Sequence, residues 1–300
     1  MRVRNRRGVP DKRVRQRYRK YENGYGRGGR RQVPEAAQAM QEDSVAEYEH
    51  DIYGLLDRHE GRSVPRCDYM ASQPDLNAGM RAILVDWLVF VAAGQKLKLE
   101  TLFLTVNIVD RFLDQRQTTR QRLQLVGVAA MRIASKFEEF TAIGKTAAVL
   151  MTSSAYTVDD VLRMEVCILT ALKFVICVPT AAHFLRRFQR LNKCPEDSAH
   201  GHLMHYLLEL ALLDLRMTRY EPSRLVAAAA LLSNKLRKQQ PSWPPRLASH
   251  CKFDLLAVRA CAQEMCSIFE AAAASPLQAV RTKFSHQDFC SVATQPWRCS

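Results

Sequence analysis

The chain has 300 residues, of which 47% are hydrophobic and 25% charged, a balance typical of a soluble globular protein with one large or two smaller domains. Its apolar runs are shorter than the roughly 20 residues that cross a bilayer, and its start lacks the apolar segment of a secretory signal. These features argue against a membrane-spanning or secreted protein.

Residues 1–33 differ in composition from the rest of the chain. Residues 1–31 hold thirteen Lys or Arg against two acids, which is +11 of the formal net charge of +14. Because aliphatic residues are scarce, we expect a disordered basic leader. Two interpretations stay open: a solvated leader, or a nuclear-import or nucleic-acid-binding segment whose tyrosines could stack on bases.

Residues 34–78 are predicted to form an N-terminal helix and a linker. The helix extends from Pro34 to about Glu60, because proline suits a first helical position and apolar residues recur at steps of three and four. These apolar residues are Val45, Tyr48, Ile52 and Leu55.

From residue 79 to 177 the sequence predicts helix after helix, without strand-like alternation. An apolar stripe begins at Met80. The following segment, LETLFLTVNIVDRFL, is apolar on nearly every side, which is typical of a helix surrounded by others. The next one, LQLVGVAAMRIASKF, contains small residues that allow neighbouring helices to approach closely.

A similar pair of segments, HYLLELALLDLR and SRLVAAAALLSNKL, follows about 100 residues later. The chain therefore repeats one helical unit, in which amphipathic helices surround a buried small-residue helix. We predict an all-α protein with a first repeat over 79–177, a second over 178–290 and a tail over 291–300.

Two charges interrupt the apolar patterns of the first repeat. Glu165 lies on the apolar face of the helix after Thr157, and Lys136 follows the small residues of the preceding helix. A carboxylate in an apolar stripe is costly unless it is paired. Either each charge meets local partners or water, or the two pair with each other and face a partner protein.

No phosphate-binding loop, nucleophile elbow or metal-binding helix motif occurs in the sequence. We therefore expect a protein that is not an enzyme and that needs no cofactor or metal. His200, His202 and His205 could suggest metal ligands, but they stand at a predicted helix start, and we interpret them as surface residues.

Four motifs resemble a known family: MRAILVDWL, ETLFLTVNIVDRFL, RLQLVGVAAM and IASKFEEF. They are similar to the cyclin box of mitotic A- and B-type cyclins, and PTAAHFLRRF with YEPSRLVAAAA is closer to the B types. The resemblance implies two tandem five-helix cyclin folds after an N-terminal helix. It also implies a regulatory subunit, in nucleus and cytoplasm, that binds and activates a cyclin-dependent Ser/Thr kinase in mitotic or meiotic control.

By the same resemblance, the first repeat holds the kinase surface. Lys136 and Glu165 match the family's pair that contacts kinase backbone groups. Phe137 and Glu138, which follow Lys136, are expected to bind the kinase as well. Another surface matches the family's docking site for Arg-x-Leu peptides of substrates and inhibitors. We call it the docking patch, and its residues are Met80, Ile83, Leu84, Trp87, Leu123 and Gln124.

The chain departs from A- and B-type cyclins at two places near these surfaces. Phe90 replaces an acid beside the docking patch, and FTAIGKTAAVL replaces a proline-containing loop near the kinase surface. An alternative class is a cyclin-fold transcription or nucleic-acid adaptor. It should carry positive charge on its folded repeats, whereas here nucleic acid could bind only through the leader. No membrane partner is expected.

Overall fold

The structure is a computed structural model that describes residues 48–66 and 68–297. The basic leader, and the part of the predicted 34–60 helix before residue 48, lie outside the described residues. The α-helices are α3 (Glu49–His59), α4 (Ala78–Gly94), α5 (Leu99–Gln115), α6 (Arg120–Glu138), α7 (Lys145–Met151), α8 (Val158–Ala171), α9 (Ala181–Leu191), α10 (Ala199–Leu213), α11 (Pro222–Leu236), α12 (Pro245–His250), α13 (Leu255–Ala271) and α14 (Ala279–Phe284).

Four short 3-10 helices complete the regular elements of this part of the chain: η1 (Glu60–Ser63), η2 (Tyr69–Ser72), η3 (Leu215–Arg219) and η4 (Gln287–Phe289). The described residues contain helices and no strand, which confirms the predicted all-α class. None of these helices combines the length and apolar character needed to span a bilayer.

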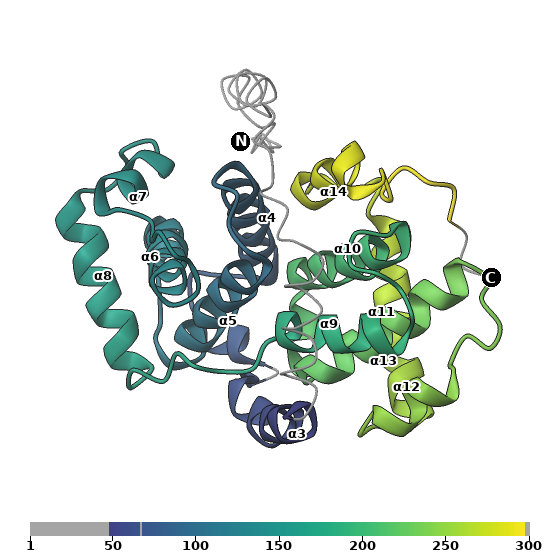
Figure 1. The fold of residues 1–300 in the computed structure, drawn as a ribbon. Helices are drawn as coiled ribbons and strands as arrows, with labels where there is room; N and C mark the ends of the chain where they lie inside the picture. The colour runs from purple at the N-terminus through teal and green to yellow at the C-terminus, as the bar shows by residue number, and fades with distance from the viewer. Residues whose placement is uncertain (1–47, 67, 298–300) are drawn as a thin grey trace, which may run out of the picture. The chain divides into compact units, whose positions relative to one another are not determined.

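Helices α4 to α8 form the first lobe, with α5 and α6 packed at its centre (Figure 1). The segment that is apolar on nearly every side becomes α5, in which 12 of 17 residues are buried. In α6 the small residues allow close packing: a Cβ at Gly127 would lie 2.8 Å from Leu84 Cδ1 of α4. The composition of α6 therefore sets how closely α4 approaches it.

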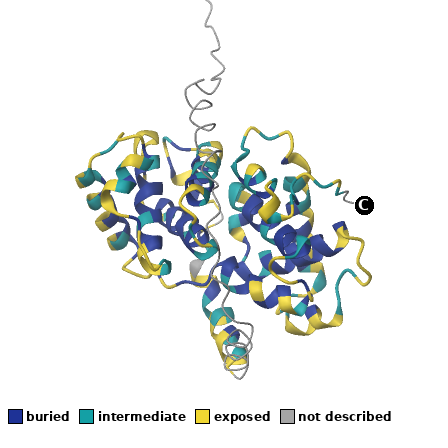
Figure 2. Cartoon of the chain, turned by 45° about the horizontal axis from the view of Figure 1, so that its top comes forward, coloured by how far each residue is buried: buried dark blue, intermediate teal, exposed yellow. Residues whose placement is uncertain are grey.

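Helices α9 to α14 form the second lobe, in which α10 and α11 take the places that α5 and α6 have in the first. The small residues at 226–230 of α11 are fully buried. Figure 2 shows the buried residues gathered inside each lobe. Each copy of the repeated unit has five helices, α4 to α8 in the first and α9 to α13 in the second, which confirms the predicted tandem arrangement.

Helix α4 lies at the junction of the lobes and contacts α5 and α6 on one side and α10 and α14 on the other. Its Arg81 is fully buried and binds both carboxylate oxygens of Asp110 on α5 at 2.7 Å. The same guanidinium donates to the Leu212 carbonyl of α10 at 2.7 Å. Asp86, further along α4, accepts a hydrogen bond from the first backbone N–H of α14. Polar bonds thus join the two lobes.

The segment after α3 is tied to the second lobe by a buried carboxylate. Glu60 accepts hydrogen bonds from Ser223 N at 2.7 Å and Ser223 Oγ at 2.6 Å, at the N-terminus of α11. A negative charge is favourable at that end of a helix dipole. Lys252 completes the cluster with its Nζ 2.5 Å from Glu60 Oε1.

The apolar face predicted for α3 is only partly used in packing. Tyr48, Ile52 and Leu55 are exposed by 57%, 42% and 51%, whereas Tyr53 is buried, with its ring 6.3 Å from that of Phe184. The periodicity correctly indicated a helix at 49–59, but tertiary packing selected a different face.

Candidate functional site

Lys136 and Glu165 come together on the surface of the first lobe. Lys136 lies in the last turn of α6, and Glu165 lies in the middle of α8, which packs against α6. Thr157 is the N-cap residue of α8 and forms a capping box with Asp160, which fixes where the helix begins. Lys136 Nζ lies 3.1 Å from both carboxylate oxygens of Glu165. Of the two arrangements open from sequence, the structure has the direct pair.

The two partners differ sharply in exposure. The Glu165 side chain is 6% exposed and the Lys136 side chain 48% exposed. Glu165 Oε1 accepts no hydrogen bond from any described residue. The pair therefore combines a half-exposed ammonium, which another molecule can reach, with a buried carboxylate that the ammonium covers.

The third member of this cluster is Arg132, which was not predicted from the sequence. It stands one helical turn before Lys136, and its Nη1 forms an ion pair with Glu165 Oε2. The sequence did contain a signal: an arginine four residues before a lysine, inside a helix otherwise rich in small and apolar residues. Two cations on one face imply a shared anion, but which anion depends on the packing of α8.

Exposed apolar side chains occur on the same two elements. Phe137 is 50% exposed directly after Lys136, and Phe140 is fully exposed just beyond α6. Val166 on α8 is 63% exposed, and Phe174, after the end of α8, is 69% exposed. Exposed apolar groups of this size, on or just beyond the two helices that carry a polar pair, are typical of a protein-binding surface.

The other predicted kinase-contact residue, Glu138, is half-buried and lies outside the charge cluster. Burial raises the pKa of its carboxyl group, and the nearby charge of His183 acts in the opposite direction. Its backbone carbonyl accepts a hydrogen bond from Lys98 Nζ at 2.5 Å. The altered loop that follows is held by a bond from Ile143 N to Ser135 Oγ at 3.0 Å.

The docking patch lies on α4 and the start of α6, and the structure divides it into core and surface. Leu84 and Leu123 are buried, at 5% and 7% exposure, and Ile83 is 61% exposed. Met80, Trp87 and Gln124 are partly buried. The part available to another molecule is therefore Ile83 with the edges of these three side chains, together with partly buried Phe90.

The three clustered histidines are packed inside the second lobe, so their interpretation as surface residues was wrong. His200 and His202 are buried, and His205 Nε2 lies 2.7 Å from Glu209 Oε1. Burial favours a higher pKa for Glu209, but Lys283 and His205 outweigh it and hold the pKa at about 2. Helix α14 and η4, from much later in the sequence, cover this part of α10.

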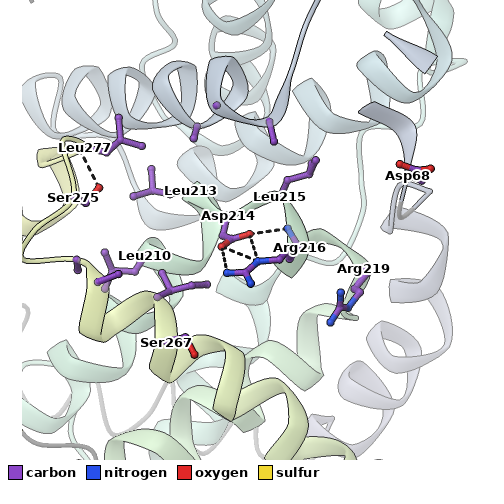
Figure 3. A pocket seen from close by; sticks show the side chains of 16 residues that line it. Asp68, Leu210, Leu213, Asp214, Leu215, Arg216, Arg219, Ser267, Ser275 and Leu277 are labelled. Carbon is purple, nitrogen blue, oxygen red and sulfur yellow. Dashed lines mark hydrogen bonds and ion pairs between the residues drawn. The ribbon is translucent and has the colours of Figure 1, made fainter. Parts of the chain in front are cut away.

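Metal-binding geometry does not occur within the described residues, where no three His, Cys, Asp or Glu side chains are grouped to hold an ion. A pocket of about 750 Å³ opens between α4, the end of α10, η3 and α13 (Figure 3). Figure 3 shows Asp214 and Arg216 turned toward each other, and their closest atoms are 2.7 Å apart. Arg219 pairs with Glu264. The charged side chains of this largely apolar pocket are thus engaged with each other or with neighbours, apart from Asp68 at its edge.

Comparison with known proteins gives the class of the chain. Residues 51–177 match the family model described as "Cyclin, N-terminal domain", and residues 179–297 match "Cyclin, C-terminal domain". The chain belongs to the cyclin family, whose members are regulatory subunits rather than enzymes. A viral cyclin from herpesvirus saimiri has the same fold, with a TM-score of 0.61 at 22% identity, over 71% of this chain and 97% of that one.

Relatives within the family are mitotic cyclins of both predicted types. "G2/mitotic-specific cyclin-A" of Hydra viridissima is 36% identical over 83% of this chain, and "Cyclin-B2-1" of Oryza sativa subsp. japonica is 38% identical over 84%. The aligned part is 60% of the length of each relative. These identities confirm the resemblance to A- and B-type cyclins, and they do not separate the two types.

Proposed function

We propose that this chain is the regulatory subunit of a cyclin-dependent Ser/Thr kinase and acts in G2/M mitotic or meiotic control, in nucleus and cytoplasm. Membership of the cyclin family and the names of its A- and B-type relatives support this function. The observation that carries it is the Lys136–Glu165 pair, preformed between α6 and α8 and bordered by exposed Phe137.

The proposed mechanism is a shift in the conformational population of the kinase. A kinase with its regulatory helix rotated outward lacks the ion pair that orients ATP phosphates. A surface that binds only the inward position stabilises that state, and moving the ratio from 1:99 to 99:1 takes about 5.5 kcal/mol of differential binding. Here Lys136 would donate to kinase carbonyl groups, and Glu165 would accept from a kinase N–H at the place that the Lys136 ammonium vacates. The exposed phenylalanines would supply apolar area.

The docking patch is proposed to bind short segments of substrates or inhibitors. Exposed Ile83 and the edge of Trp87 offer an apolar contact for a leucine-like side chain. Because Phe90 stands where A- and B-type cyclins carry an acid, we expect the apolar part of an Arg-x-Leu peptide to contribute more to its affinity here than the arginine.

Purified full-length chain, mixed with each of a panel of purified cyclin-dependent kinases, tests the function. We expect at least one kinase to phosphorylate histone faster in its presence. Lys136→Ala should weaken binding to that kinase about tenfold or more, because a half-exposed charged anchor is lost from the interface. Circular dichroism should show unchanged helix content, since Arg132 still pairs with Glu165.

Lys235→Ala is the matched control, because Lys235 is exposed in the last turn of α11 in the second lobe, as Lys136 is in the last turn of α6 in the first. The proposed function is wrong if the parent chain activates no kinase of the panel. The assignment of the site is wrong if Lys136→Ala activates the kinase as well as the Lys235→Ala control.

A further inference from the structure

The charge cluster at the proposed kinase surface contains one more cation than its carboxylate requires. Arg132 and Lys136 lie one turn apart on α6, and both contact Glu165 of α8. We propose that Arg132 is a positioning residue: it neutralises Glu165 from inside the lobe and so frees Lys136 to turn toward a main-chain carbonyl oxygen of the kinase. This inference rests on the function proposed above.

Exposure separates the roles of the two cations. The Arg132 side chain is 11% exposed and the Lys136 side chain 48% exposed, although both contact a carboxylate that is 6% exposed. Arg132 is therefore the internal partner of Glu165, and Lys136 is the partner that a second protein can reach. The three formal charges leave the cluster with a net charge of +1, which favours an electron-rich acceptor such as a carbonyl group.

Arg132 lowers the free energy needed to move Lys136 away from Glu165. A buried carboxylate that loses its only countercharge is strongly destabilised. If Lys136 were the sole cation, its ammonium would be held 3.1 Å from Glu165. Turning the ammonium outward would then leave the buried carboxylate without a countercharge and destabilise the fold. Because Arg132 remains paired with Glu165, the ammonium can instead exchange one acceptor for another.

Stability alone gives little reason for an arginine at this position. Arg132 Nε is buried and makes no hydrogen bond with any described residue, so the guanidinium is incompletely satisfied. Its sequence neighbours Met131 and Ile133 are buried apolar residues. Lys136 alone would leave Glu165 with a countercharge, so the fold does not require a second cation at this position. A role in setting the state of Lys136 accounts for a residue that packing by itself does not favour.

The test is a double-mutant cycle of Arg132→Met and Lys136→Ala in the full chain, measured against the kinase that the parent activates. Arg132→Met should weaken kinase binding about fivefold to tenfold, because Lys136 is then retained by Glu165. Adding Lys136→Ala to Arg132→Met should cost less in binding than Lys136→Ala does alone. Arg132→Lys, which keeps the charge, should restore most of the affinity.

Urea unfolding of the same variants separates positioning from a purely structural role. Either single change leaves one cation on Glu165, so its urea midpoint should move little. The double variant leaves the carboxylate without a countercharge, and its midpoint should fall by more than the sum of the single shifts. The two changes should thus be less than additive in binding and more than additive in stability.

Each outcome points to a different conclusion. If Lys136→Ala weakens kinase binding and Arg132→Met, although folded, binds like the parent, the positioning role is wrong and the proposed function stands. If Lys136→Ala has no effect, the kinase site itself is wrong. The positioning role is also wrong if the weaker kinase binding of Arg132→Met is explained by its lower stability. It is wrong as well if Arg259→Met, on the exposed face of α13, weakens kinase binding to the same extent.

Discussion

At the scale of single residues, the chain places polar side chains in its core and gives them specific partners. Glu165 has two cations, and Arg81 has Asp110 and a backbone carbonyl. Each arrangement offsets the desolvation of a charge with directed contacts. A third example is His200, where the partners require the neutral form of the ring.

His200 should make stability depend on pH. Its Nε2 accepts from Asn192 Nδ2 at 3.3 Å and lies 3.1 Å from Ser233 Oγ. Burial, together with the charge of Arg237, lowers the pKa of His200 to about 4. Between that value and the ordinary value of about 6.5, the unfolded chain binds a proton that the folded chain does not, so stability decreases as pH falls through this range.

We expect the His200 contribution to lower the free energy of unfolding by about 1–2 kcal/mol between pH 7 and pH 5. Urea unfolding at the two pH values measures it. His200→Gln keeps a polar side chain that does not titrate, so this variant should lose less stability over the same interval. An identical pH dependence in parent and variant would contradict the assignment.

At the scale of helices, two glycines differ in what decides the effect of a side chain: packing at Gly201, and intrinsic helix propensity at Gly54. Gly201 lies in the first turn of α10, and a Cβ there would be 2.5 Å from the Glu196 carbonyl oxygen and closer still to that of Pro195. Gly54 lies inside α3, and its Cβ would meet nothing nearer than Arg58 Nη1 at 3.6 Å.

The same substitution should therefore have opposite effects at the two positions. Gly201→Ala should destabilise the protein by about 1–3 kcal/mol, because backbone atoms must move to admit the methyl group. Gly54→Ala should stabilise it by up to about 1 kcal/mol, because alanine is the better helix former. Thermal unfolding of both variants measures the two effects. Equal shifts in melting temperature would show that the backbone atoms close to Gly201 do not prevent a larger residue there.

At the scale of the whole molecule, buried polar bonds join the two lobes. Arg81 reaches from α4 to Asp110 in the first lobe and to the Leu212 carbonyl in the second. Asp86 of α4 bonds the first N–H of α14, and Glu60 ties the segment after α3 to the N-terminus of α11. Such contacts hold the face proposed for the kinase on a rigid support, as differential binding to one kinase conformation requires.

Because of these links, calorimetry of the parent should show one cooperative unfolding transition. Asp110→Ala leaves Arg81 buried without its carboxylate and should lower the free energy of unfolding by about 3–5 kcal/mol. The double variant Arg81→Met/Asp110→Leu should recover much of that loss, since no buried charge then remains at the site. Two separate transitions in the parent would show that the lobes unfold independently.

The residues of the proposed site were predictable from sequence to different degrees. Lys136, Glu165 and the docking patch followed from the cyclin-like motifs, because such motifs keep residue types at fixed helical positions. Arg132 and the burial of His200 and His202 were missed. Arg132 depends on α8, His200 on α11, and His202 on η4; these elements are distant in sequence and reach those residues only through packing.

The sequence by itself determined two all-helical repeats, each with a central small-residue helix, because helical periodicity and residue size act within a few turns of the chain. Only the tertiary structure decided which cation lies inside and which outside at Glu165, which face of α3 is buried, and how much of the docking patch is open. Those outcomes depend on which helices meet and at what separation, and the free energy of a buried charge is set by neighbours that local sequence does not specify.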